Sequence, residues 1–234
     1  MYWHFFSVKL FLSWGARPIV AMFLVVFGYY YLSVYVSAER LKFGALFFVI
    51  GMYYFNAQNI SFFRKSNLFF IISIVTHLQF FIILFAYASK IVVTERLFKD
   101  FSISKIKLNF IIVGSLFSMI IFFFFSQHIF NKFYSYHNDF SIEEYIRLFV
   151  FFALALYYSR FKLEVIAVFF VLFLFVFMFG GKRVNMFGYF VFLYYALKSN
   201  GGINLGVILT SIYFFVGWLE YSTDIIYCGL NRPC

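Results

Sequence analysis

Two adjacent cations, Lys182 and Arg183, follow a pair of glycines in the stretch MFGGKRVNMFG, residues 178–188. They interrupt an apolar run, Val165–Leu197, that holds no other charge. A guanidinium offers bidentate contacts to phosphate oxygens, so this pair is suited to hold an anion at a membrane surface. The alternative is that both side chains anchor helix ends at the lipid headgroups. The run is too long for one membrane helix of about 20 residues, which predicts two short helices joined at a tight glycine bend.

A second group of candidate residues surrounds His77, which lies in the middle of an apolar segment close to Ser73 and Thr76. An ionisable side chain at membrane depth is costly and usually faces a cavity or a partner. Arg64 precedes His77 by thirteen residues, about 20 Å along a helix. This spacing predicts Arg64 at the mouth of a cavity and His77 deeper inside. The alternatives are a hydrogen bond from His77 to a neighbouring helix, and headgroup contacts for Arg64 and Lys65.

The loop Asn131–Asp139 mixes aromatic and hydrogen-bonding side chains, among them Tyr136 and His137. Such a surface suits sugars, whose faces stack on rings while their hydroxyls take polar contacts. An aromatic belt beside a polar turn has the same composition, and this alternative stays open.

Glu143 and Glu144 are adjacent carboxylates, and paired carboxylates perform acid–base chemistry on sugars. Neighbouring residues on a helix point about 100° apart, so these two do not form a facing pair. The sequence instead predicts that they stabilise the start of the next helix, with Ser141 as its cap and Glu144 closing a capping box.

The elements that position these residues are predicted to be membrane helices. Of 234 residues, 65% are hydrophobic and 12% are charged, whereas soluble domains average about 25% charged residues. The sequence therefore predicts an all-α integral membrane protein, a polytopic bundle of about nine hydrophobic segments in one transmembrane domain over residues 1–234. The segments are Tyr2–Trp14, Ile19–Val36, Phe43–Ile60, Leu68–Ala88, Asn109–Phe130, Ile146–Tyr158, the two halves of Val165–Leu197, and Ile203–Trp218.

The net charge of +10 does not predict a nucleic-acid partner, because the cations are dispersed in short loops. The cysteines, Cys228 and Cys234, lie in the tail, and no spacing typical of a metal site or of a cofactor-binding loop is present. We therefore expect no metal and no cofactor.

The basic loops give an orientation, because Lys and Arg favour the cytoplasmic side. With the polar stretch Ser89–Leu108 inside, alternation of the segments places Lys198 inside and Arg17 outside. Arg64–Lys65 and Lys182–Arg183 both fall outside, and they share a side in either orientation because an even number of segments separates them.

The order of these features resembles the carboxy-terminal part of bacterial O-antigen and exopolysaccharide polymerases of the Wzy/EpsG type. The resemblance covers about Ile60–Tyr213, and its residues are Arg64, then His77 in THLQFFIILFAY, then FGGKRVNMFGYFVFLYYALKSNGGINLGVILTSIYF. Members of that family usually carry further amino-terminal spans, which implies that this chain lacks some of them.

The resemblance implies a multi-pass enzyme of the bacterial inner membrane that works on the periplasmic face. It would join glycan repeat units carried on undecaprenyl pyrophosphate, in contact with membrane lipid and with a chain-length regulator protein as a further partner. Arg64, Lys182 and Arg183 would hold the pyrophosphate together with Lys65 and Arg147, and His77 would act as a base or orient the acceptor hydroxyl. The alternatives are a transporter or flippase of lipid-linked sugars and a non-catalytic membrane subunit.

Overall fold

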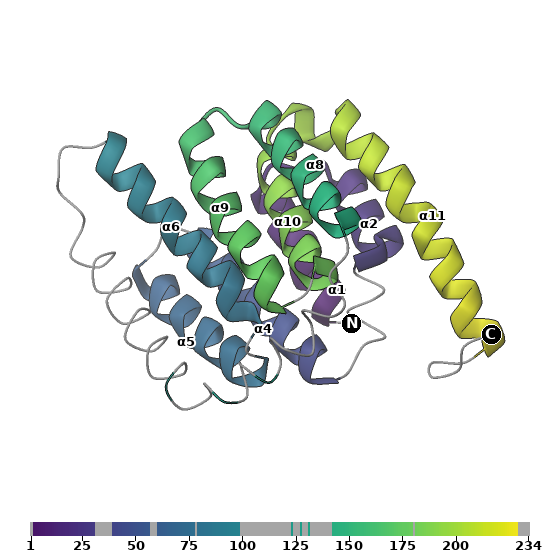
Figure 1. Cartoon of the computed structure of the whole chain (residues 1–234), viewed down its shortest axis with the longest axis horizontal. Coiled ribbons are helices and arrows are strands. Elements are labelled where there is room, and N and C mark those ends of the chain that lie inside the picture. The colour runs from purple at the N-terminus through teal and green to yellow at the C-terminus, as the bar shows by residue number, and fades with distance from the viewer. Residues whose placement is uncertain are drawn as a thin grey trace. The chain divides into compact units, whose positions relative to one another are not determined.

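The computed structural model describes residues 2–30, 39–56, 60–77, 79–98, 142–179 and 181–228, together with residues 123, 127 and 131. Figure 1 shows that the elements in these ranges are helices. They are α1 Tyr2–Ser13, α2 Pro18–Phe27, α4 Glu39–Asn56, α5 Ile60–Thr76, α6 Phe80–Phe98, α8 Ile142–Tyr158, α9 Lys162–Phe179, α10 Gly181–Ala196, the short 3-10 helix η1 Asn200–Gly202, and α11 Leu205–Cys228.

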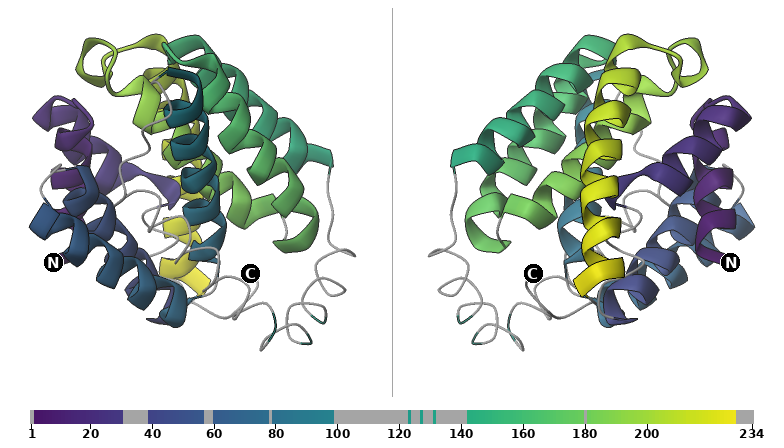
Figure 2. Two further views of the ribbon diagram at one scale, coloured as in Figure 1. Left: turned by 90° about the vertical axis from the view of Figure 1, so that its left-hand side faces the viewer. Right: turned by 90° about the vertical axis from the view of Figure 1, so that its right-hand side faces the viewer.

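The prediction of an all-α protein is therefore confirmed for the described ranges. The predicted division of Val165–Leu197 into two helices is confirmed as well, because α9 ends at Phe179 and α10 begins at Gly181. Gly180 itself lies outside the described residues. Within the described residues one helical stretch, Asn200–Thr223, is long and apolar enough to cross a membrane. Its main part, α11, is the long yellow helix of Figure 2. The predicted loop with Tyr136 and His137, and most of the predicted segment Asn109–Phe130, lie outside the described residues.

The chain forms two compact units. The first unit contains residues 1–80 and 193–234, and the second contains residues 81–192. The boundaries fall inside α6 and α10, so the last turn of α10 belongs to the first unit.

In the first unit, α4 and α5 pack closely through small residues spaced seven apart. The Ser66 hydroxyl donates to the Gly51 carbonyl at 2.9 Å, and the Ser73 hydroxyl donates to the Gly44 carbonyl at 2.8 Å. Seven residues make about two helical turns, so the two glycines lie on one face of α4 and the two serines on one face of α5. The residue numbers of the contacting pairs increase along α5 and decrease along α4, so the helices are antiparallel. A Cβ on Gly51 would lie 2.7 Å from the Phe70 ring. Glycine therefore lets the two backbones approach closely.

The turn after α1 packs against the turn before α11, also within the first unit. The Arg17 amide donates to the Gly201 carbonyl at 2.8 Å, and a Cβ on Gly15 would lie 3.6 Å from the Lys198 Cα. Gly201 has φ +63°, and an added Cβ would meet the Arg17 side chain at 2.6 Å, so glycine is required there. Trp14 meets Tyr194 edge to face at 5.4 Å between ring centroids.

This contact corrects the predicted orientation, which placed Arg17 and Lys198 on opposite sides of a membrane. The predicted segment Leu68–Ala88 is also divided, because α5 ends at Thr76 and α6 begins at Phe80. The Thr76 hydroxyl donates to the carbonyl of residue 72, a bond that bends helices. That Arg64–Lys65 and Lys182–Arg183 share a side of the membrane stays a prediction, because the chain between them includes residues 99–122, which lie outside the described ranges.

Two predicted loops are helical where the structure describes them. Arg64 and Lys65 were placed in a loop, but α5 begins at Ile60 and includes both. Lys90 was placed at the start of a polar loop, but α6 continues to Phe98. Hydropathy alone misplaced these boundaries because a helix continues through charged residues when its backbone hydrogen bonds are made.

Candidate functional site

In the second unit, α8 and α10 begin side by side. A Cβ on Gly181, the first residue of α10, would lie 2.0 Å from Oε2 of Glu144 in the first turn of α8. The Asn185 side-chain amide donates to the Glu144 carbonyl at 3.1 Å. Further along, a Cβ on Gly188 would lie 2.5 Å from the Leu148 side chain. The residue numbers of the contacting pairs increase in the same direction along both helices. α8 and α10 are therefore parallel, and their N-termini lie at the same end of the unit.

Small residues on α10 explain this packing. Gly181, Asn185 and Gly188 are spaced four and three apart, so they form one face of the helix. The facing residues of α8, Glu144, Leu148 and Phe151, have the same spacing; Phe151 packs on α10 by stacking at 6.3 Å on Phe192. The glycines admit the larger α8 side chains, which brings the two helix starts together.

Three cations singled out from the sequence are contributed by these adjoining helix starts. Lys182 and Arg183 are the second and third residues of α10, and the Arg183 side chain is exposed. Arg147 lies one turn after Glu143 on α8, and its Nη2 is 3.0 Å from the Glu143 carboxylate. Helix N-termini carry a partial positive charge, which adds to that of the side chains. The end of the unit is therefore suited to an anion.

Glu144 is a buried carboxyl group within this cationic end. The residue is 8% exposed, and among the described residues no hydrogen bond or ion pair is made by its carboxylate. Asn185 is 0% exposed, and its Oδ1 has no hydrogen-bond partner in the described part of the chain. The predicted capping box of Ser141 and Glu144 stays a prediction, because Ser141 lies outside the described residues. The carboxylate of Glu144 packs against Gly181.

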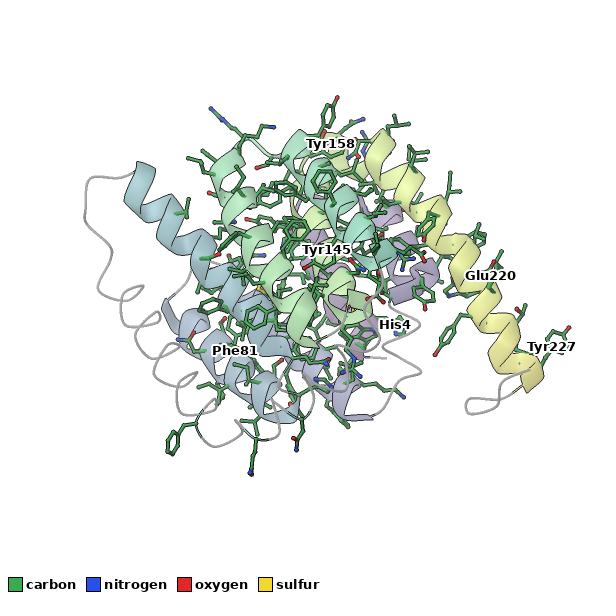
Figure 3. The ribbon with its side chains drawn as sticks, in the orientation of Figure 1. His4, Phe81, Tyr145, Tyr158, Glu220 and Tyr227 are labelled. Carbon is green, nitrogen blue, oxygen red and sulfur yellow. The ribbon has the colours of Figure 1, made fainter. Side chains whose placement is uncertain are left out.

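Tyr145, labelled in Figure 3, fixes α8 on α9. Its hydroxyl donates to the Phe173 carbonyl at 3.2 Å, and its ring stacks on the Phe173 ring at 5.9 Å between centroids. This contact lies next to Glu144 in sequence, so it holds the first turn of α8 in a defined position.

A second charged pair in this unit was missed by sequence reasoning. Lys90 Nζ on α6 lies 3.7 Å from Oε2 of Glu164 on α9, and the two side chains are 14% and 5% exposed. Lys90 also lies over the Tyr87 ring, 5.5 Å from its centroid. Both charges stand beside polar loop residues in the sequence, so nothing in the pattern indicated that they meet inside a helix bundle.

The remaining predicted site residues belong to the first unit. Arg64 and Lys65 lie in the second turn of α5, and the Lys65 side chain is exposed. His77 follows the end of α5, where its ring lies 6.1 Å from the Phe80 ring in an edge-to-face contact. His77 is thus at a helix break rather than in mid-helix. The structure places Arg147, Lys182 and Arg183 on two helices that begin side by side, and a role for Arg64, Lys65 and His77 at the same site stays a prediction.

Comparison with protein-family models, with curated proteins and with solved structures finds no match to this chain. The resemblance to polysaccharide polymerases therefore depends on the residues alone.

Proposed function

We propose that this chain is a polytopic integral membrane protein of the bacterial inner membrane. The support is the distribution of exposed apolar side chains, which occur on several helices rather than in one patch. On α11 they include Leu205, Ile208, Leu209, Ile212, Val216 and Leu219, each at least 44% exposed. On α8 they include Ile142, Ile146, Phe149 and Val150. Lipid is the environment in which such helix faces are stable.

Within that membrane protein, we propose a polymerase that joins repeat units carried on undecaprenyl pyrophosphate. The single observation that supports this proposal is that α8 and α10 begin side by side, with Arg147 in the second turn of α8 and Lys182 and Arg183 in the first turn of α10. A pyrophosphate leaving group gathers negative charge as its bond to the sugar breaks. Fixed cations and helix N-termini stabilise that charge in the transition state.

The function is tested in a bacterial strain that lacks its own repeat-unit polymerase. Expression of this chain is expected to restore a ladder of long polysaccharides on a gel. Arg183→Ala and Arg147→Ala are expected to shorten the ladder to single units, because each removes a cation at the pyrophosphate site. Single-unit material with the unaltered chain, at verified membrane expression, would overturn the proposal.

Arg160→Ala is the matched control for these variants. Arg160 is exposed and follows the C-terminal end of α8, so it lies at the opposite end of that helix from Arg147. The ladder is expected to persist in this variant. Its loss would indicate a general requirement for positive charge rather than a site at the helix starts.

A second candidate is a transporter of lipid-linked sugars, and the buried pair Lys90–Glu164 favours it. Ionisable residues inside a membrane bundle often mark ion or proton pathways. Restoration of single repeat units at the outer surface, in a strain that lacks its own flippase, would support transport. The polymerase predicts chain extension in the first strain and no rescue in the second.

A further inference from the structure

Glu144 differs from its neighbour Glu143 in its burial and in the partners of its carboxylate. The Glu143 side chain is 78% exposed and forms an ion pair with Arg147. Glu144 is buried, and its carboxylate packs against the first residue of α10 without a hydrogen-bond donor in the described residues. A carboxylate that makes no such bond keeps its lone pairs available to accept a proton.

Asn185 gives an independent indication that a polar ligand group belongs here. Its side-chain amide nitrogen donates a hydrogen bond to the Glu144 carbonyl, which places the whole carboxamide beside Glu144. Its Oδ1 is fully buried and has no donor in the described part of the chain. A buried acceptor without a partner is unfavourable. A hydroxyl group, such as that of an incoming sugar, would supply the missing donor.

We propose that Glu144 is the general base for chain extension, with Asn185 as the residue that positions the acceptor hydroxyl; this inference rests on the proposed polymerase function. Glu144 takes the proton of the acceptor hydroxyl as its oxygen forms a bond to the anomeric carbon of the donor. The bond from that carbon to the pyrophosphate oxygen breaks, and the electron pair leaves with undecaprenyl pyrophosphate. Arg147 and Arg183 stabilise the charge that the leaving group carries away.

This arrangement explains why base and cations share one end of the unit. The acceptor oxygen loses its proton as it bonds to the anomeric carbon from which the pyrophosphate departs, so the carboxylate and the cations are required within one substrate length. Parallel packing of α8 and α10 supplies both from their first turns.

The test uses the purified full chain in lipid nanodiscs with a radiolabelled undecaprenyl-pyrophosphate repeat unit as the probe. Glu144→Gln keeps the shape of the side chain and removes the proton acceptor. We expect the rate of chain extension to fall by about 100-fold or more. Retention of the labelled donor is expected to stay unchanged, since the cations are intact. Glu220→Gln, which changes an exposed carboxylate on α11, is the control and is expected to keep both.

Glu144→Asp separates a lost base from a misfolded protein, because it retains a carboxylate and is expected to recover part of the rate. Extension by Glu144→Gln within about threefold of the unaltered chain would overturn the inference and leave the polymerase standing. Loss of donor retention together with rate would overturn it too, because Glu144 would then act in binding. Absence of extension by the unaltered chain would instead overturn the proposed function.

Discussion

The helix contact α4–α5 of the first unit and the contacts α6–α9 and α8–α10 of the second bury polar side chains in different ways. In the first unit the buried polar groups between α4 and α5 are the short neutral hydroxyls of Ser66 and Ser73, each bonded to a glycine carbonyl. In the second unit they are the charged pair Lys90–Glu164 and the carboxyl and amide of Glu144 and Asn185. Neutral groups with satisfied bonds stabilise a helix contact. Charged or unsatisfied groups are costly to bury, which makes them candidates for a functional role.

The largest effect that follows from this contrast is at the buried ion pair. Glu164→Ala leaves the Lys90 charge among helices without its carboxylate, and we expect a loss of about 3–5 kcal/mol in the free energy of unfolding. The measurement is denaturation of the purified protein in detergent, followed by circular dichroism. Glu143→Ala, which breaks an exposed pair, is the control, and its expected cost is about 0.3–0.5 kcal/mol.

The double variant Lys90→Met, Glu164→Leu sharpens this test. It removes both charges and fills the same space, so stability is expected to recover to near that of the unaltered chain. A double variant as unstable as Glu164→Ala would show that packing, rather than charge, dominates at this contact.

A smaller effect is expected at the glycine contact of the first unit. Gly51→Leu would force the Phe70 ring away from α4, since even a Cβ would approach it to 2.7 Å. Overpacking of this kind costs about 1–3 kcal/mol. Gly217→Ala is the control, because a Cβ there would lie 3.6 Å from the Tyr29 ring, an ordinary contact. Equal thermal midpoints for both variants would contradict the close α4–α5 packing.

The smallest effect is expected from Ser73→Ala, which removes one neutral hydrogen bond. Its expected cost is about 1 kcal/mol, and the Gly44 carbonyl keeps its place in the helix. Ser222→Ala, where the exposed hydroxyl bonds within its own helix, is expected to change the free energy of unfolding by less. A cost at Ser73 as large as that at Glu164 would remove the distinction between the two units.

Local patterns in the sequence determined the helical class and the division of Val165–Leu197 into two helices. Long apolar runs predicted helices because backbone groups in lipid must bond within their own segment, and the glycine pair beside two cations predicted the end of such a run. The same patterns named Lys182 and Arg183 as anion-binding candidates, and the family resemblance added Arg147. They did not reveal the break after Thr76, because the turn at His77 contains neither glycine nor proline.

Only the tertiary structure decided which residues meet. Glu144 and Gly181 are far apart in sequence, as are Lys90 and Glu164, and no local pattern records that either pair is in contact. Burial separates Glu144 from Glu143, although the two are neighbours of the same type. The physical reason is that hydropathy and helix propensity depend on a few adjacent residues, whereas the environment of a charge is set by whichever helix packs against it.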